Sequence, residues 1–356
     1  MPAPPAEPRP DPERARPVVL AHGWNTTAYQ ILTPGFHHWF SARGDAVAGL
    51  VPRPGLWVVG GAPIAAPARL GDAVEELERA AALAGAAVCY VGAQDRLARH
   101  CLHDPRYSAA VLGAEPWWVP ETWSAILAGR ASLRAQLSRA RNKGITARVL
   151  AAGAPPTGLE RVLAEWLAGR GLPPLGFLTT PWVLGDLRDR RLAVAEREGR
   201  PVGFLVLTPI PGREGWLVEQ IVRGHAAPNG TAELLVDAAF TWMAARQAPF
   251  ATLGLAPLAV PPGAAALPEP AWWLRGALAW LRAHGRRFYN FEGLRAFKAK
   301  LAPAGWDPVY ALLNRPRISP LAMLRVGEAV VGGNTLAFVA RMVARAARSE
   351  VRSLLG

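Results

Sequence analysis

The chain has 356 residues, of which 51% are hydrophobic and 14 are tryptophan. This length exceeds that of a usual single domain, so we expect two domains of roughly 150 residues, each with enough apolar side chains for a core. There are 40 lysines and arginines against 27 acidic residues, a net charge of +13. The excess favours an anionic partner, nucleic acid or a membrane surface, although the arginine-rich usage of a GC-rich genome accounts for it equally well.

The rest of the composition excludes several classes of protein. Cys89 and Cys101 are too few for a disulfide framework, which fits a reducing cytosol. Residues 1–17 mix proline with charge and lack the apolar run of a signal peptide, so we expect a disordered leader. No window offers about 18 uninterrupted apolar residues, the length that a membrane-spanning helix needs. A soluble or peripheral protein is expected.

The first half shows the pattern of an α/β layer. Residues 56–63 and 87–92 are short, rich in β-forming residues and bounded by glycine or proline, as buried strands are. Between them, residues 72–84 carry apolar side chains at helical spacing with glutamates on the other side. We expect a first domain over residues 18–154, joined to the second by the small and proline-rich segment 151–156.

The second half, residues 155–316, has a similar order of elements. It begins with a helix and a hairpin whose turn contains Glu198-Gly199-Arg200, and it ends with a closing strand. The expected elements are a helix at 157–168, a hairpin at 191–206, a strand at 217–222, a helix at 231–246, a strand at 251–255, a helix at 272–284 and a strand at 309–313.

Residues 317–356 form a tail of different character. Arg341, Arg345, Arg348 and Arg352 recur at spacings of four, three and four, which places them on one face of a helix. Such a basic amphipathic helix can lie on an anionic membrane. The alternative is a helix docked on its own domain with its arginines in water.

A strand, a Pro-Asn-Gly loop and a helix follow one another from residue 216 to residue 235. The free amide groups of such a helix N-terminus bind anions, so Asn229, Gly230 and Glu233 are candidate substrate-binding residues. The alternative for Glu233 is a structural role, as a favourable negative charge in the first helical turn. Acyltransferases of the GNAT fold keep their pyrophosphate loop at this place, and the order of elements is similar, but the fingerprint for coenzyme A is absent here.

Taken together, the motifs resemble the C-terminal domain of lysyl-phosphatidylglycerol synthases, also called multiple peptide resistance factors. The resemblance covers residues 18–315. It rests on HGWNTTAYQIL (His22–Leu32), VVGGAPIAAP (Val58–Pro67), LRAQLSRARNKGI (Leu133–Ile145), VRGHAAPNGTAELL (Val222–Leu235), TLGLAPLA (Thr252–Ala259) and GLRAFKAKLAPAGWDPVYAL (Gly293–Leu312).

The resemblance implies tandem GNAT-like domains, each a mixed sheet flanked by helices, in a stand-alone soluble member. It also implies transfer of an aminoacyl group from aminoacyl-tRNA to phosphatidylglycerol, to a related anionic lipid or to a small acceptor, at the cytoplasmic face of the membrane and without a metal or cofactor. Two alternatives stay open. They are an N-acyltransferase dependent on acyl-CoA and a non-catalytic protein that binds anionic lipid.

Aminoacyl transfer needs a base for the acceptor and cations for the acidic backbone of the donor. Glu219 is a candidate for the base or for holding the donor α-amine, and Arg223 for holding a phosphate or oxyanion. A salt bridge within the strand is the alternative for this pair. Lys298 is a candidate to reach the leaving oxygen.

Two basic patches are candidates for phosphate binding. Arg295 and Lys300 flank Lys298 and could grip tRNA or lipid phosphate, unless they form a solvated helix face. The second patch has no acidic residue and suits a polynucleotide that spans both domains. Its candidate residues are Arg134, Arg139, Arg141 and Lys143.

A metal site is not expected. The run His100-Cys101-Leu102-His103-Asp104 contains metal-binding residue types, but neighbours on one helical turn point in different directions. No second ligand group follows at zinc spacing, so a helix end is the better interpretation.

Overall fold

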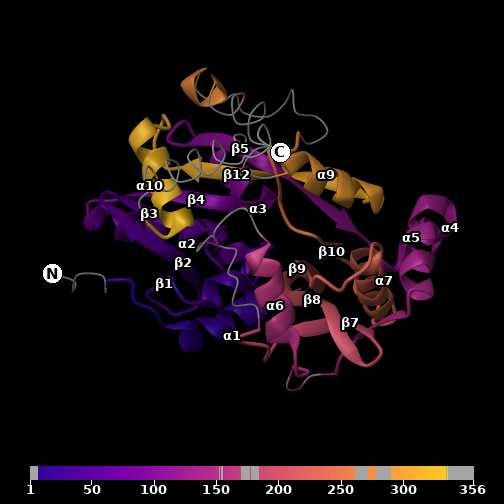
Figure 1. Cartoon of the computed structure of the whole chain (residues 1–356). Helices are drawn as coiled ribbons and strands as arrows, with labels where there is room; N and C mark the ends of the chain where they lie inside the picture. The colour runs from indigo at the N-terminus through magenta and orange to yellow at the C-terminus, as the bar shows by residue number, and fades with distance from the viewer. Residues whose placement is uncertain are drawn as a thin grey trace, which may run out of the picture.

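The computed structural model describes residues 7–151, 153, 155–169, 177, 184–260, 272–276, 279, 290–333 and 335. Its strands form one mixed sheet in the order β1-β2-β3-β4-β12-β5-β10-β9-β8-β7-β6, with β11 paired to β5. Helices cover both faces of this sheet (Figure 1). The expected α/β class, with a mixed sheet flanked by helices, is therefore confirmed.

The first part of the chain builds one end of the sheet. Strands β3 and β4 run parallel and α2 connects them, as the alternating pattern predicts. The elements are α1 (Pro12–His22), η1 (Tyr29–Leu32), β1 (His37–Phe40), β2 (Val47–Arg53), β3 (Leu56–Gly60), η2 (Pro67–Arg69), α2 (Leu70–Leu83), β4 (Ala87–Ala93), α3 (Asp95–Cys101), β5 (Ser108–Trp118), η3 (Pro120–Thr122), α4 (Trp123–Gly129), α5 (Ala131–Asn142) and β6 (Ile145–Val149).

The later part builds the other end. The expected hairpin is confirmed as β7 and β8, with Glu198 and Gly199 in the left-handed turn between them. The elements are α6 (Leu159–Ala168), β7 (Arg191–Arg197), β8 (Arg200–Ile210), η4 (Pro211–Arg213), β9 (Gly215–Arg223), α7 (Thr231–Ala244), β10 (Ala251–Thr252), β11 (Ala256–Pro257), α9 (Phe291–Lys300), β12 (Gly305–Leu313) and α10 (Pro320–Val331).

Two strands cross between the expected halves. Strand β6, from the first half, pairs with β7 of the second, and β12, from the second half, lies between β4 and β5 of the first. The limits of the two expected domains remain a prediction. The crossing strands nevertheless tie the two halves into one hydrogen-bonded sheet, so residues far apart in sequence meet at its centre.

Alternation along the strands explains the layers. In β3, Leu56 and Val58 face the core under α1 and α10, whereas Trp57 and Val59 face the core under α2 and α3. At the other end, α5 and α7 cover one face of the sheet and α6 covers the opposite face. Each face is buried, which is what the near-continuous apolar runs of the strands predict.

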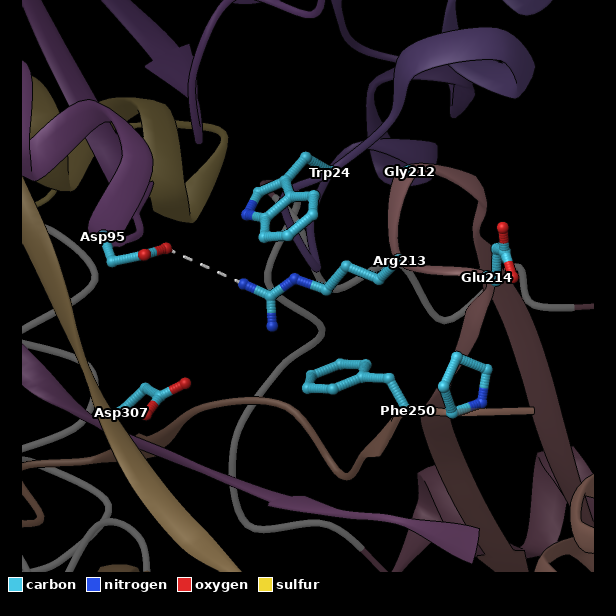
Figure 2. Close-up of a pocket in the computed structure, with 8 residues that line it drawn as sticks. Trp24, Asp95, Gly212, Arg213, Glu214, Phe250 and Asp307 are labelled. Atoms are coloured by element: carbon cyan, nitrogen blue, oxygen red, sulfur yellow. Dashed lines mark ion pairs between the residues drawn. The ribbon is translucent and has the colours of Figure 1, made fainter. Parts of the chain in front are cut away.

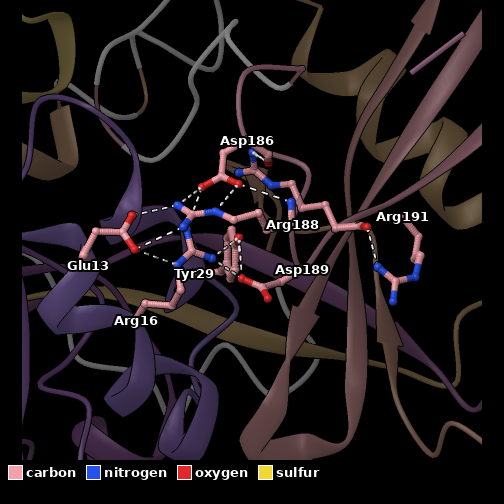
Figure 3. A network of polar contacts seen from close by, with 8 residues as sticks. Glu13, Arg16, Tyr29, Asp186, Arg188, Asp189 and Arg191 are labelled. Atoms are coloured by element: carbon pink, nitrogen blue, oxygen red, sulfur yellow. Dashed lines mark hydrogen bonds and ion pairs between the residues drawn. The ribbon is translucent and has the colours of Figure 1, made fainter. Parts of the chain in front are cut away.

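Residues 12–17 correct the expectation of a disordered leader, because they form the first part of α1. Asp11 caps this helix and Pro12 opens it. Arg16 then binds both Asp186, at 2.6 Å between Nη2 and Oδ2, and Asp189 (Figure 3). The Tyr29 hydroxyl also donates to Asp189, at 3.0 Å. These contacts anchor α1 to the start of the second half.

Parallel pairing of β9 with β10 extends over only two positions, Ala251 with Trp216 and Thr252 with Leu217. The next residues of β9, from Val218 on, have no partner in β10. On its other side, β10 lies next to β5, and the Thr252 hydroxyl donates to the carbonyl oxygen of Pro116 on β5, at 2.8 Å. After β10 the chain leaves β9, and its next residues contact α9.

Part of the tail is described. Helix α10 packs through Val326 and Ala329 on the core beneath β2 and β3. The arginines from Arg341 to Arg352 and most of the helix expected at 272–284 lie outside the described residues. Among the residues that are described, no helix has the length and apolarity needed to cross a bilayer.

Candidate active site

Lys298 lies inside the protein, at the point where α9 meets the chain after β10. Its ammonium group donates to the carbonyl oxygens of Gly254, at 2.7 Å, and Leu255, at 2.9 Å. The residue is only 4% exposed. Burial disfavours the charged form and lowers the pKa of Lys298 to about 7, although Glu115 opposes the change. A lysine with this pKa exchanges a proton readily at neutral pH.

Glu115 is the buried acid that acts on Lys298. It sits on β5 and accepts hydrogen bonds from the Thr26 hydroxyl, at 2.6 Å, and the Gln94 amide, at 2.8 Å. Burial raises the pKa of Glu115, against the opposing effects of the Thr26 and Thr252 hydroxyls and of the cations Arg213 and Lys298. The acid thus forms hydrogen bonds within the first half and acts on Lys298, in the second half, through its charge.

A pocket of about 450 Å³ lies at the junction of the two halves, and one of its lining residues, Asp307, is the strand partner of Glu115. Figure 2 shows the guanidinium of Arg213 between the rings of Trp24 and Phe250. It lies 4.6 Å from the first ring centre and 4.5 Å from the second. Arg96 stacks on Trp24 as well, at 3.5 Å. Two arginines therefore hold one tryptophan in place.

Three acidic residues line the same pocket, Asp95, Glu214 and Asp307. Asp95 Oδ1 lies 3.9 Å from Arg213 Nη2, and Asp307 accepts a 3.2 Å hydrogen bond from the Trp117 indole. Burial raises the pKa of Asp307, against the effects of Trp117 and Arg213. Figure 2 shows Asp95 and Asp307 turned toward the Arg213 guanidinium. The pocket therefore presents carboxylates, which can bind an ammonium group, beside an arginine that stacks on both aromatic rings.

The predicted pair Glu219 and Arg223 is separated in the structure. Glu219 is buried in an ion pair with Arg190, at 3.1 Å, and accepts a 2.5 Å hydrogen bond from the Thr208 hydroxyl. Arg223 is exposed at the end of β9. A β-bulge opposite Val206 and Leu207 turns Glu219 into this interior position. The partner of Glu219 is thus Arg190, which precedes β7, and not Arg223 of its own strand.

The Pro-Asn-Gly loop packs against α5. Gly230 has a φ of +95°, and a Cβ added there would lie 2.2 Å from the Gln136 carbonyl oxygen. Gly230 is the N-cap of α7. Asn229 is exposed beside it.

The remaining predicted residues are dispersed over α5, α7 and α9. Lys300 pairs with Glu233, at 2.5 Å, which joins these two helices. Arg295 is exposed on α9. On α5, Arg139 is exposed, Arg134 donates to the Leu127 carbonyl at 2.7 Å, and Arg141 pairs with Asp237 at 2.7 Å. Lys143, the C-cap of α5, is exposed as well.

Sequence reasoning missed most of the junction. Trp24, Asp95, Glu115, Arg213 and Phe250 come from separate elements, and no spacing in the chain relates them. Trp24 and Asp307 each lie within one of the family motifs quoted above, and this membership was the one indication in the sequence that they belong to the site. Among the described residues, no three His, Cys, Asp or Glu side chains are grouped as a metal ion requires.

Comparison with known proteins gives a consistent result. A family model described as "Phosphatidylglycerol lysyltransferase, C-terminal" matches residues 16–313. A phosphatidylglycerol lysyltransferase of Bacillus subtilis (strain 168) is 26% identical over 328 residues, which are 89% of this chain but 36% of that protein. The chain therefore spans about a third of the length of this relative.

Solved structures share the fold. One is a C-terminal domain from Agrobacterium fabrum, described as that of a lysylphosphatidylglycerol synthetase, with 25% identity, a TM-score of 0.72 and coverage of 90% of this chain and 97% of that one. Another is the Bacillus licheniformis L-PGS, with 22% identity, a TM-score of 0.73 and coverage of 92% and 98%. FemX is also similar in fold, at 10% identity, a TM-score of 0.50 and coverage of 89% and 98%.

Proposed function

Because the chain belongs to the family of the phosphatidylglycerol lysyltransferase C-terminal domain, we propose that it is an aminoacyltransferase with phosphatidylglycerol or a related anionic lipid as acceptor. Aminoacyl-tRNA is the proposed donor, and the cytoplasmic membrane face the proposed place of reaction. The net charge of +13 supports both choices, since donor and acceptor are anions. A small anionic acceptor in place of the lipid is an outcome that the experiment below distinguishes.

The observation on which the proposal depends is the buried amine of Lys298. In its neutral form the amine has two N–H groups and one lone pair. The carbonyl oxygens of Gly254 and Leu255 take both N–H groups, at 2.7 and 2.9 Å, which leaves the lone pair to accept a proton. With a pKa of about 7, a large fraction of Lys298 is in this form at neutral pH.

The reaction then follows from proton transfer. The acceptor hydroxyl attacks the carbonyl carbon of the aminoacyl ester while its proton passes to Lys298. The bond to the ribose oxygen of the donor breaks, and the ribose oxygen receives the proton from Lys298. One ester replaces another without net change in protons.

The junction pocket supplies a second part of the proposed site. We assign Asp307, with Asp95, to the ammonium of the aminoacyl group, because these acids line the pocket together. Arg213 sets the limit of the pocket by occupying the space between Trp24 and Phe250. Glu219 has a structural partner in Arg190, so Lys298 is the stronger candidate for the base.

The test is transfer by the purified full chain. Radiolabelled lysyl-tRNA and alanyl-tRNA are each supplied with vesicles of phosphatidylglycerol, with phosphatidylcholine vesicles, or with soluble glycerophosphate. A labelled lipid that forms only with phosphatidylglycerol supports the proposal. Transfer to glycerophosphate alone assigns a small acceptor. No product with any donor, and acyl transfer from acetyl-CoA instead, would refute the proposal.

Variants test the role of the lysine. We expect Lys298→Met to lower turnover about 10²- to 10⁴-fold, the usual contribution of a general base. Lys298→Arg keeps the charge but cannot release a proton, and should be equally inactive. Thermal unfolding of both variants verifies the fold. Full turnover in a folded Lys298→Met protein would remove Lys298 from the mechanism.

A further inference from the structure

The chain forms a bulge between β10 and β11, beside the buried lysine of the candidate site. Thr252, the last residue of β10, pairs with Trp117 of β5, and Ala256, the first residue of β11, pairs with Ala114. Residues 253–255 therefore lie opposite only two residues of β5, and we call them the β10–β11 bulge. An extra residue of this kind bends the strand and interrupts its pairing, which frees backbone groups for other partners.

The bulge turns two neighbouring carbonyl groups toward one amine. The carbonyl oxygens of Gly254 and Leu255 both accept hydrogen bonds from Lys298 Nζ, at 2.7 and 2.9 Å. In a regular strand successive carbonyl groups point to opposite sides, so two neighbours cannot bind the same atom. Gly254 has a φ of +69°, which glycine adopts without steric cost. The irregular backbone is therefore a requirement of the lysine site.

The side chain of Thr252 fixes the conformation of the bulge. Its hydroxyl donates to the carbonyl oxygen of Pro116, at 2.8 Å, and accepts from the backbone N–H of Gly254, at 3.0 Å. Thr252 is fully buried. One hydroxyl thus satisfies a backbone donor and a backbone acceptor that the interrupted ladder leaves without strand partners. Thr252 acts on Lys298 through the backbone of the next residues.

The helix that carries the lysine is attached to the same part of β5. The Trp118 indole donates to the carbonyl oxygen of Leu301, which directly follows α9, at 2.9 Å. The backbone N–H of Ala304 donates to the carbonyl oxygen of Trp117, at 2.8 Å. The bulge and the end of α9 are therefore both held by residues 116–118 of β5. This common support sets the position of the amine relative to its two acceptors.

The bulge also governs the surroundings of the amine. Gly254 and Leu255 are partly exposed, whereas Lys298 is 4% exposed, so the bulge lies between the amine and solvent. Glu115, on β5, is the charged group that opposes the effect of burial on the pKa of Lys298. The Thr252 hydroxyl in turn lowers the pKa of Glu115. A displaced bulge would admit water to the amine and favour its ammonium form.

We propose that Thr252 is a positioning residue of the candidate site, whose hydroxyl holds the β10–β11 bulge so that Gly254 and Leu255 bind the Lys298 amine and keep water from it. The inference rests on the proposed function in so far as Lys298 is the base of the transfer. The positioning itself is a property of the folded chain and is measured without any substrate.

The experiment titrates the Lys298 amine in the full chain by nuclear magnetic resonance, with lysine labelled with ¹³C at Cε. The chain has three lysines among its 40 basic residues, Lys143, Lys298 and Lys300, so Lys298→Met identifies the signal. We expect a wild-type midpoint near pH 7. In Thr252→Val, which removes the hydroxyl at nearly unchanged shape, the pKa of Lys298 should rise toward its ordinary 10.5. Thr252→Ser keeps the hydroxyl and should restore the wild-type midpoint.

Thr231→Val is the matched control. Thr231 is also fully buried, and its hydroxyl donates to a proline carbonyl oxygen, that of Pro228, at 2.7 Å. Thermal unfolding should show a comparable loss of stability in Thr231→Val and Thr252→Val, but only the second variant should move the Lys298 midpoint. A midpoint that does not rise in folded Thr252→Val, or that rises equally in Thr231→Val, would overturn the inference.

Gly254→Ala reaches the same bulge by another route. The added Cβ would sit at a φ of +69° and 3.3 Å from Leu217 Cδ1, so the bulge must shift. The Lys298 midpoint should rise in this variant as well, although the Thr252 hydroxyl is present. This variant decides the matter if Thr252→Val does not fold, since an unchanged midpoint here would also contradict the inference.

Turnover gives a second measurement that a purely structural role would not affect. Thr252→Val should lower kcat about fivefold at pH 7, because a smaller fraction of Lys298 is neutral there, and should regain kcat in alkaline buffer. KM should stay unchanged, since Thr252 makes no proposed contact with substrate. A loss of kcat that is equal at every pH would mean that the residue acts on the fold alone.

The titration separates this inference from the proposed function. If Lys298 titrates near pH 7 and responds to Thr252→Val, but no donor supports transfer, the positioning role stands and the proposed function fails. If the wild type transfers aminoacyl groups and Thr252→Val changes neither the titration nor kcat, the positioning role fails and the proposed function stands. A wild-type Lys298 that titrates near 10.5 would likewise refute the positioning role.

Discussion

Glu219 pairs with Arg190, 3.1 Å away, and both side chains are almost fully buried. Removing one partner of a buried ion pair leaves an uncompensated charge and costs about 3–5 kcal/mol. We therefore expect Arg190→Met to lower the free energy of unfolding by this amount, with a smaller further loss on adding Glu219→Gln. Urea unfolding of the two single variants and the double variant measures the coupling.

The exposed pair Arg148 and Glu196 is the matched control for that cycle, because its coupling should be below about 1 kcal/mol. Additive losses at Arg190 and Glu219 would mean that the two residues act separately, and would restore Glu219 as a candidate base.

Lys298 should make stability depend on pH. Its pKa is about 7 when folded and near its ordinary 10.5 when unfolded, because burial disfavours the ammonium. Between these values the unfolded chain binds more protons, so the contribution of Lys298 to stability increases from about pH 7 to pH 10.5. Lys298→Met should flatten this part of the profile. Urea midpoints of the two proteins at intervals across that range test the prediction, and parallel profiles would contradict it.

Gly230 should resist substitution by alanine. The change places a side chain at a φ of +95° and a Cβ 2.2 Å from the Gln136 carbonyl oxygen. We expect a loss of about 1–3 kcal/mol in the free energy of unfolding, since strain of this kind has that magnitude. Gly199→Ala is the control, because Gly199 has a φ of +73° and open space around it. Equal losses in the two variants would show that contact with α5 contributes nothing.

Arg16 should hold α1 to the second half. Its bonds to Asp186, Asp189 and the Tyr29 hydroxyl are lost in Arg16→Met, at a cost of about 1.5–3 kcal/mol for a charged hydrogen-bond donor. Hydrogen exchange in residues 12–22 should accelerate. Arg14→Met, on the same helix, removes only a 3.9 Å contact with the Phe40 ring and should have a smaller effect. Comparable acceleration in both variants would count against the anchor.

The secondary structure follows from local sequence in most places. The strands at β3, β4 and β9, the helices α2, α6 and α7, and the β7–β8 hairpin are confirmed within a few residues. The physical reason is that turn residues and apolar periodicity act over short distances. The expectation of a disordered leader was wrong for residues 12–17, because α1 is held by contacts with Asp186 and Asp189, which lie far along the chain.

The sequence by itself determined the family motifs, the basic charge and the order of elements, all of which are encoded in neighbouring residues. Only the tertiary structure decided which charges meet. Residues 298 and 300 read as one basic run, yet Lys298 is buried against two carbonyl oxygens while the partly exposed Lys300 pairs with the buried Glu233. Burial and pairing depend on β12 entering between β4 and β5 and on β10 leaving β9, and no local pattern records these contacts.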